Sequence, residues 1–136
     1  MTRESKYKKT IRMDCEARIE TFGDIIIEEG VFIKGDVVAN SGSVFLKYGA
    51  TIKGNVFASI VVHIGQEANI IGKVESFSVE NYGNITGDIN NVGFFRSFGK
   101  SSGKIIARMV LLGEYGVHEG PIRSMCVKID EEARAF

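Results

Sequence analysis

Residues 35–74 read GDVVANSGSVFLKYGATIKGNVFASIVVHIGQEANIIGKV, and in this stretch Gly35, Gly54 and Gly72 are each followed two residues later by valine. The same pattern, glycine and then valine or isoleucine two residues later, continues along the chain at a similar spacing, which gives a series of six: Gly35-Val37, Gly54-Val56, Gly72-Val74, Gly87-Ile89, Gly103-Ile105 and Gly120-Ile122. Successive glycines, called marker glycines below, are 19, 18, 15, 16 and 17 residues apart. A repeat of this length indicates a solenoid in which each repeat forms one coil.

Apolar residues hold fixed places relative to the marker glycines. Ten and eight residues before each glycine stand Ile25/Ile27, Val44/Leu46, Val62/Ile64, Phe77/Val79, Gly93/Phe95 and Val110/Leu112. Two residues before it stand Ile33, Ile52, Ile70, Ile85, Ser101 and His118. With the valine or isoleucine after the glycine, each coil has three inward patches, which predicts three short strands around a triangular section. Stacked coils then bury one continuous aliphatic core.

We therefore predict an all-β fold, a single-stranded right-handed parallel β-helix of about six to seven coils. The alternative is the left-handed hexapeptide helix, but its coil length is nearly constant, and the spacing of the marker glycines is not. The length variation is expected mainly between the third strand of one coil and the first strand of the next. The β-helix domain should span residues 23–129, with a C-terminal tail at 130–136.

The N-terminal segment divides into two predicted parts. Residues 1–10 are rich in lysine and arginine and are expected to form a basic flexible tail. In residues 11–22, Ile11, Met13, Cys15, Ala17 and Ile19 alternate with polar residues. This period of two predicts a half-buried strand that caps the first coil.

Composition limits the classes of function. The 136 residues suit one domain, and the formal net charge of zero argues against binding to nucleic acid. Two cysteines, Cys15 and Cys126, stand near opposite ends of the chain, which predicts free thiols and a cytoplasmic protein. We expect neither a signal peptide nor a spanning helix, because the apolar runs are short.

No catalytic, cofactor or metal site is expected. The stretch GKSSGK at 99–104 lacks the spacing of a phosphate loop. His118 occupies an inward column and should hydrogen-bond locally, whereas His63 should point outward, about three coils away. The two histidines therefore do not predict a shared acid–base or metal site. A trimeric acyltransferase of the hexapeptide type, which uses a single histidine at a subunit boundary, remains as an alternative that would rely on His63.

An outward column nine residues before the marker glycine is unusually apolar. It reads Ile26, Phe45, His63, Ser78, Phe94 and Leu111. Two explanations stay open for its large apolar members, Ile26, Phe45, Phe94 and Leu111. A terminal segment covers them, or they form a lateral face for a second filament, a partner or a membrane surface.

Residues 54–76 read GNVFASIVVHIGQEANIIGKVES, and this stretch resembles the repeat of the bactofilins. In that family a coil runs as Gly-x-Val-x-Ala, then Val-Val-x-Ile-Gly, then Ala-x-Ile-x-Gly-x-Val. The matching positions are Gly54, Val56, Ala58, Val61, Val62, Ile64, Gly65, Ala68, Ile70, Gly72 and Val74. The resemblance covers about residues 24–122 and weakens after Gly87, as in a divergent member.

The resemblance implies a function. Bactofilins are bacterial cytoskeletal proteins that polymerise without nucleotide through the ends of a right-handed β-helix. Many carry an N-terminal membrane-targeting segment and scaffold cell-wall or morphology proteins. The resemblance therefore implies a homopolymer that scaffolds cell-shape or cell-envelope machinery. It also implies peripheral contact with the inner face of the cell membrane through the basic N-terminus, although that segment lacks an apolar anchor.

The ends of a β-helix favour assembly on physical grounds as well, because end coils present unpaired backbone groups and an open core. We predict one end contact at Phe22, Ile25 and Ile27, and the other at Met109, Leu111, Met125, Val127 and Phe136. Head-to-tail and like-to-like contacts both remain open. The rival hypothesis is a non-polymerising adaptor that docks partners on the lateral face.

Overall fold

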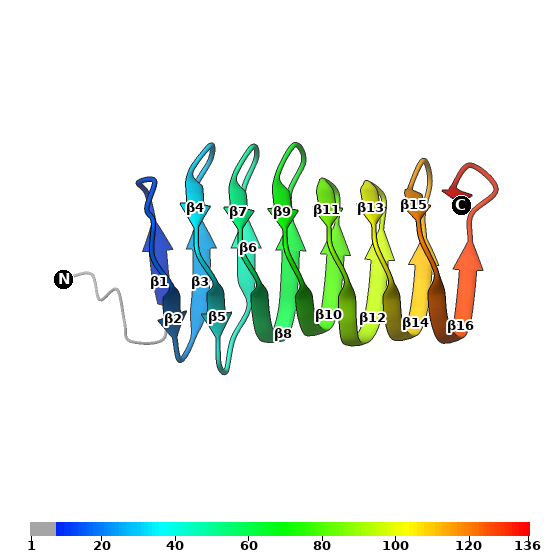
Figure 1. The fold of residues 1–136 in the computed structure, drawn as a ribbon, viewed down its shortest axis with the longest axis horizontal. Coiled ribbons are helices and arrows are strands. Elements are labelled where there is room, and N and C mark those ends of the chain that lie inside the picture. Colours follow the sequence, from blue (N-terminus) through cyan, green and yellow to red (C-terminus); the bar gives the residue numbers. More distant parts are fainter. Residues whose placement is uncertain (1–7) are drawn as a thin grey trace.

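The computed structural model describes residues 8–136, and every regular element in this range is a β-strand. Eight strands stacked side by side form the main path of one sheet, and seven more form a second sheet. All strand pairs are parallel. The chain is thus a β-solenoid of about eight coils, one or two more than predicted, with its two ends at opposite ends of a rod (Figure 1).

The strands divide among three sides of each coil. The first sheet runs in the order β1 (Lys8–Ile11), β3 (Asp24–Ile27), β6 (Val44–Leu46), β8 (Val56–Ile64), β10 (Val74–Asn81), β12 (Ile89–Ser97), β14 (Ile105–Leu112) and β16 (Ile122–Ile129), with β2 (Ile19–Thr21) and β5 (Val37–Ala39) beside it. The second contains β4 (Phe32–Lys34), β7 (Thr51–Lys53), β9 (Asn69–Ile71), β11 (Asn84–Thr86), β13 (Lys100–Ser102), β15 (Val117–Glu119) and β17 (Arg134–Ala135).

Three kinds of corner join the sides. The turn corner leads from the first side of a coil to the second, for example from β3 to β4. The glycine corner leads from the second side to the third and carries the marker glycine. The bulge corner leads from the third side to the first side of the next coil. From β8 onward no turn interrupts the bulge corner, and one bent strand with a local register shift crosses it.

The glycine corner is the constant feature of the solenoid. The inward residue before each marker glycine and the one after it are always four positions apart, as in Ile85 and Ile89, both about 1 % exposed. Gly87 has a φ of +144°, and an added Cβ would overlap the carbonyl oxygen of Gly72 in the preceding coil. Glycine is therefore required here by both conformation and close stacking.

This requirement gives a first testable prediction. Gly87→Ala should lower the free energy of unfolding by about 3 kcal/mol, since strain and overlap add. Gly30→Ala is the matched control. Gly30 has a φ of +70°, but the space around its Cβ position is open. An alanine there should therefore lower the free energy of unfolding by only about 1 kcal/mol, the strain of a left-handed backbone conformation. Denaturant titration of both variants measures the difference. Equal losses would show that stacking at the glycine corner is not tight.

The inward columns of two coils differ from the prediction. Phe77 and Gly93 were expected inward, but Phe77 is 57 % exposed and the inward places belong to Val79 and Asn81 in one coil and to Phe95 and Ser97 in the next. The reason is the turn corner, which is two residues shorter in these coils: Asn81 is four residues before Ile85, whereas Ile64 is six before Ile70. The length variation therefore occurs at two corners, not mainly at one.

Hydrogen bonds compensate for Asn81 and Ser97, the polar residues at these inward places. Asn81 is fully buried, and its Nδ2 donates to Ser97 Oγ at 3.1 Å and to the carbonyl oxygen of Lys100 at 2.9 Å. Its Oδ1 accepts from the backbone N–H of Gly83 at 3.0 Å. The side chain thus closes the short turn in the way that a backbone carbonyl closes the longer ones, where Val31 N–H donates to Glu28 O at 3.2 Å.

The N-terminal segment is a complete first coil, which corrects the prediction of a tail at 1–10 and a capping strand at 11–22. β1 begins at Lys8 and pairs with β3. The backbone of Cys15 forms an isolated parallel β-bridge with that of Ile33, and β2 pairs with β5. This segment continues the solenoid on all three sides because its apolar residues fall in the inward columns. Residues 1–7 of the predicted tail lie outside the described residues.

The C-terminal residues complete the last coil. Asp130 to Ala133 form a turn in which the N–H of Ala133 donates to Asp130 O at 2.9 Å, and β17 then pairs with β15. Residues 130–136 are thus part of the solenoid, although they were predicted as a tail. Residues 8–136 contain no helix that is long and apolar enough to cross a membrane.

Candidate functional site

The C-terminal end of the solenoid leaves its core open. Val127 and Ile129 continue the inward columns of Val110 and Leu112, which are 2 % and 0 % exposed, but no further coil covers them. Val127 is therefore 43 % exposed and Ile129 47 %. β16 also forms the last strand of its sheet, with an outer edge that pairs with no described strand. Apolar surface and unpaired backbone groups together make this end suited to strand addition.

The N-terminal end has a different chemical character. Lys9 pairs with Ile25 in the register of β1 and β3, so a lysine takes the inward column that holds valine, isoleucine or phenylalanine in the other coils. An inward-facing charge on an edge strand opposes pairing with another chain. The two ends of the rod are therefore not equivalent, and the C-terminal end is the more apolar of the two.

The residues predicted for end contacts fall into four groups, of which three lie away from the open C-terminal end. Ile25 and Ile27 are fully buried because β1 covers them, so their assignment to an end contact is wrong. Phe22, which is 57 % exposed, lies at the first bulge corner. Met109 and Leu111 belong to β14, which β16 covers, so they lie one coil inside the end.

Three predicted residues do lie in the last coil. Met125, Val127 and Phe136 are 84 %, 43 % and 70 % exposed. The structure thus brings these three to one end of the rod, as the sequence predicted. Whether they contact another molecule stays a prediction.

The predicted lateral face is divided between two columns. Ile26 and Phe45 are followed in register by His63, Glu80, Arg96 and Leu111. Phe94 belongs to the neighbouring column, between Ser78 and Met109. The shortened turn corners shift two coils by two residues, so counting back from the glycine chose the wrong residues there. The predicted column is therefore wrong at two of its six places, where Glu80 and Arg96 stand instead of Ser78 and Phe94.

Polar and aromatic contacts replace it. His63 Nδ1 lies 3.2 Å from Glu80 Oε1, and both side chains are 35 % exposed. The ring of His63 packs 5.5 Å from that of Tyr82, which stacks on Phe98 at 5.3 Å. No partner for His63 is apparent in the sequence, because Glu80 enters its column only through the two-residue shift.

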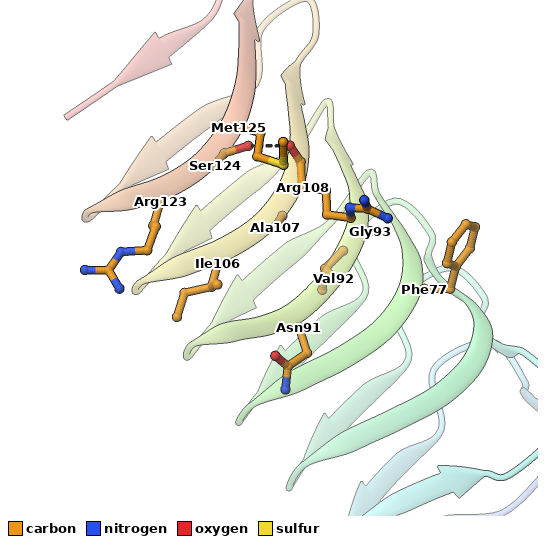
Figure 2. A pocket seen from close by; sticks show the side chains of 10 residues that line it. All are labelled: Phe77, Asn91, Val92, Gly93, Ile106, Ala107, Arg108, Arg123, Ser124 and Met125. Carbon is orange, nitrogen blue, oxygen red and sulfur yellow. Dashed lines mark hydrogen bonds between the residues drawn. The ribbon is translucent and has the colours of Figure 1, made fainter.

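A groove runs along the bulge corner of the last four coils and encloses about 610 Å³. Figure 2 shows its lining in three rows that cross the strands. The row of Asn91, Ile106 and Arg123 forms one side, Val92, Ala107 and Ser124 form the floor, and Phe77, Gly93, Arg108 and Met125 form the other side. The groove exists because the floor residues are small or buried at the bend of each strand, while Phe77 and Met125 stand out at its ends.

The groove is apolar with two cationic residues. Arg108 and Arg123 are exposed, and within residues 8–136 neither guanidinium makes an ion pair or a hydrogen bond. None of the lining residues is an aspartate or a glutamate. This groove is not apparent in the sequence, because its residues come from four coils and meet only when the bulge corners are stacked in register.

The remaining reactive side chains lie apart from the groove floor. His118 is fully buried, as predicted, with Nδ1 2.7 Å from Ser101 Oγ. Cys15 is half-buried in the first coil, and Cys126 is exposed in the last; both are free thiols. Among residues 8–136, no group of three or more histidine, cysteine or acidic side chains could hold a metal ion.

Comparison of the chain with models of known protein families, with curated proteins and with solved structures gives no match in any of the three. The fold itself therefore defines the class: an all-β parallel solenoid.

Proposed function

We propose that this chain is a non-catalytic structural protein that assembles end to end, without nucleotide, into filaments of the bactofilin kind. In this proposal the filaments scaffold cell-shape or cell-envelope machinery at the inner face of the cell membrane. The sequence resemblance suggests the class of protein. The physical argument comes from the ends of the rod.

The open C-terminal coil carries the proposal. Val127 and Ile129 occupy core columns without a covering coil, and the edge of β16 has eight residues available for pairing. Burial of apolar side chains and formation of a parallel or antiparallel ladder both favour contact with a second rod. Lys9 at the other end argues that the C-terminal contact is the stronger one.

Electron microscopy of the purified chain tests the proposal. We expect filaments whose length grows with protein concentration and does not depend on nucleotide. Val127→Arg should abolish them, because a charge buried in an apolar contact costs about 3 kcal/mol and raises the concentration needed for assembly about a hundredfold. The coils should remain folded, since Val127 is already half-exposed.

Ile71→Arg is the matched control. Ile71 is 45 % exposed on the outer side of β9, in the middle of the rod, so the same charge is introduced far from either end. Filaments should persist in this variant. Discrete single rods at high concentration in the unmodified chain would contradict the proposal, as would normal filaments of Val127→Arg.

A second function is favoured by one observation. If Lys9 closes the N-terminal end completely, pairing of two C-terminal ends gives a dimer and no filament. The chain would then be an adaptor that docks partners on its sides. Sedimentation velocity separates the two functions: the adaptor gives one small species at every concentration, whereas the filament gives species that grow.

A further inference from the structure

We propose that the groove at the bulge corner binds the turn corner of a second copy of this chain, so that rods associate side by side. The groove residues are Arg108 and Arg123 with their apolar neighbours. The docking element of the second copy is the pair of turns at 113–116 and 130–133. This contact goes beyond end-to-end assembly and does not require it.

The turn corners form an acidic edge along the rod. Figure 1 shows these turns in one row along the upper side of the view. The turn residues of the eight coils include Asp14, Glu28, Glu29, Glu67, Glu114, Asp130, Glu131 and Glu132, against only Arg12 and Lys47. The edge therefore carries a net charge of −6 in a chain whose total is zero, so charge is strongly segregated between corners.

The last two full turns are complementary to the groove in charge, and the acidic residues, like the two arginines, come from adjacent coils. The side chains of Glu114 and Glu131 are exposed and make no ion pair within residues 8–136. They lie one coil apart, about 4.8 Å, which is also the spacing of the strands that carry Arg108 and Arg123. Tyr115, which follows Glu114 in the first of the two turns, is 67 % exposed and offers a ring to the apolar groove.

Charge excludes the simplest alternative occupant. If two grooves faced each other across a two-fold axis, Arg108 and Arg123 of both copies would come together without any carboxylate. Such like-charge contacts oppose association. Nor can the turns reach the groove of their own chain, because the two corners lie on different sides of one rod. The acidic edge must therefore come from another molecule, and a heterologous contact of this kind can repeat from rod to rod.

Charge reversal provides the test, in chains that also carry Val127→Arg to suppress end contacts. Three variants are compared by sedimentation velocity: the groove variant Arg108→Glu/Arg123→Glu, the turn variant Glu114→Arg/Glu131→Arg, and the chain with all four changes. The parent should self-associate. The groove and turn variants should each weaken association about tenfold or more, whereas their equimolar mixture and the four-change chain should recover it.

Lys53→Glu/Lys73→Glu is the control, with the same change of net charge at the glycine corner, where both lysines are exposed. It should associate like the parent. Association that is unchanged in the groove variant, or not recovered in the four-change chain, would overturn the proposal. Circular dichroism of each chain shows whether the coils remain folded.

The end-to-end contact is tested by a separate measurement. In micrographs of chains with Val127 intact, the groove variant should form single filaments, while the unmodified chain forms paired or sheet-like ones. If no filaments form, but association is lost in the groove and turn variants and recovered in the four-change chain, the proposed function alone is contradicted. If filaments form, but the charge reversals do not change association in this way, the lateral contact alone is contradicted.

Discussion

Asn81→Leu should destabilise the solenoid by about 4 kcal/mol, even though leucine or isoleucine fills the same inward column in most of the other coils. Asn81 makes three hydrogen bonds at a fully buried position. Leucine would leave the N–H of Gly83, the carbonyl of Lys100 and the hydroxyl of Ser97 without this partner. Each unpaired buried polar group costs about 1–3 kcal/mol, which exceeds the gain from the added apolar surface.

Ser97→Ala is the control for this prediction. It removes one hydrogen bond of the Asn81 side chain but keeps the two that close the turns, so the expected loss is about 1 kcal/mol. Urea titration followed by circular dichroism gives both values. If Asn81→Leu were as stable as the unmodified chain, the short turn corner would not depend on the asparagine side chain. A less cooperative unfolding transition would show that the coils around Asn81 open before the others, since a solenoid can open coil by coil.

The sequence predicted the solenoid because the glycine corner is invariant. The four-residue spacing from Ile33 to Val37 recurs in every coil, and the close stacking of the marker glycines permits no insertion there. Columns counted across this corner were therefore correct. His118 could be placed in the core on this basis alone, and its hydrogen bond to Ser101 agrees with the prediction.

Columns counted further from the glycine were less accurate. The turn corner exists in two lengths, and the shorter one needs a polar residue in the core, which a search for apolar periodicity rejects. Asn81 and Ser97 were therefore overlooked, and Phe77 and Phe94 were assigned to the wrong columns. Asn81 and Ser97 are each followed two residues later by a glycine, Gly83 and Gly99, and this is the local signal that could have identified the short turn.

The first coil was missed for a related reason. Ala17 takes the place of a marker glycine, with Cys15 two residues before it and Ile19 two after it. Alanine is tolerated there because no earlier coil lies beneath it in the described residues. Without this coil, Ile25 and Ile27 seemed to lie at the end of the core, and they were assigned to an end contact that they cannot make.

The groove could not be found from a single repeat at all. Arg108 and Arg123 do not occupy equivalent positions in their coils, since Arg123 pairs with Ile106 and Arg108 lies at the bend. Their proximity depends on how one coil is stacked on the next. In this fold the core residues next to the glycine corner can therefore be predicted from the sequence, whereas the surfaces depend on register.

Acid should destabilise the C-terminal coils through His118. Burial lowers the pKa of His118 by disfavouring the charged imidazolium, against smaller opposing effects from the backbone of Gly120 and Gly103 and the charge of Glu119. The unfolded chain, whose histidine has a pKa near its ordinary value of 6.5, then binds the proton more readily than the folded one. The stabilising effect of a neutral His118 is thus complete above about pH 6.5 and is lost as the pH falls toward the lowered pKa.

His118→Ile isolates this effect, since isoleucine fills the same column in four other coils. Both chains carry His63→Gln, so that His118 is the only histidine left to titrate. Between the two pKa values, the chain with His118 should lose about 1.4 kcal/mol of unfolding free energy per pH unit relative to the isoleucine variant. Urea titrations at several pH values from neutral downward measure the difference. Parallel curves would contradict the prediction, because they would mean that the folded chain binds the proton on His118 as readily as the unfolded chain does.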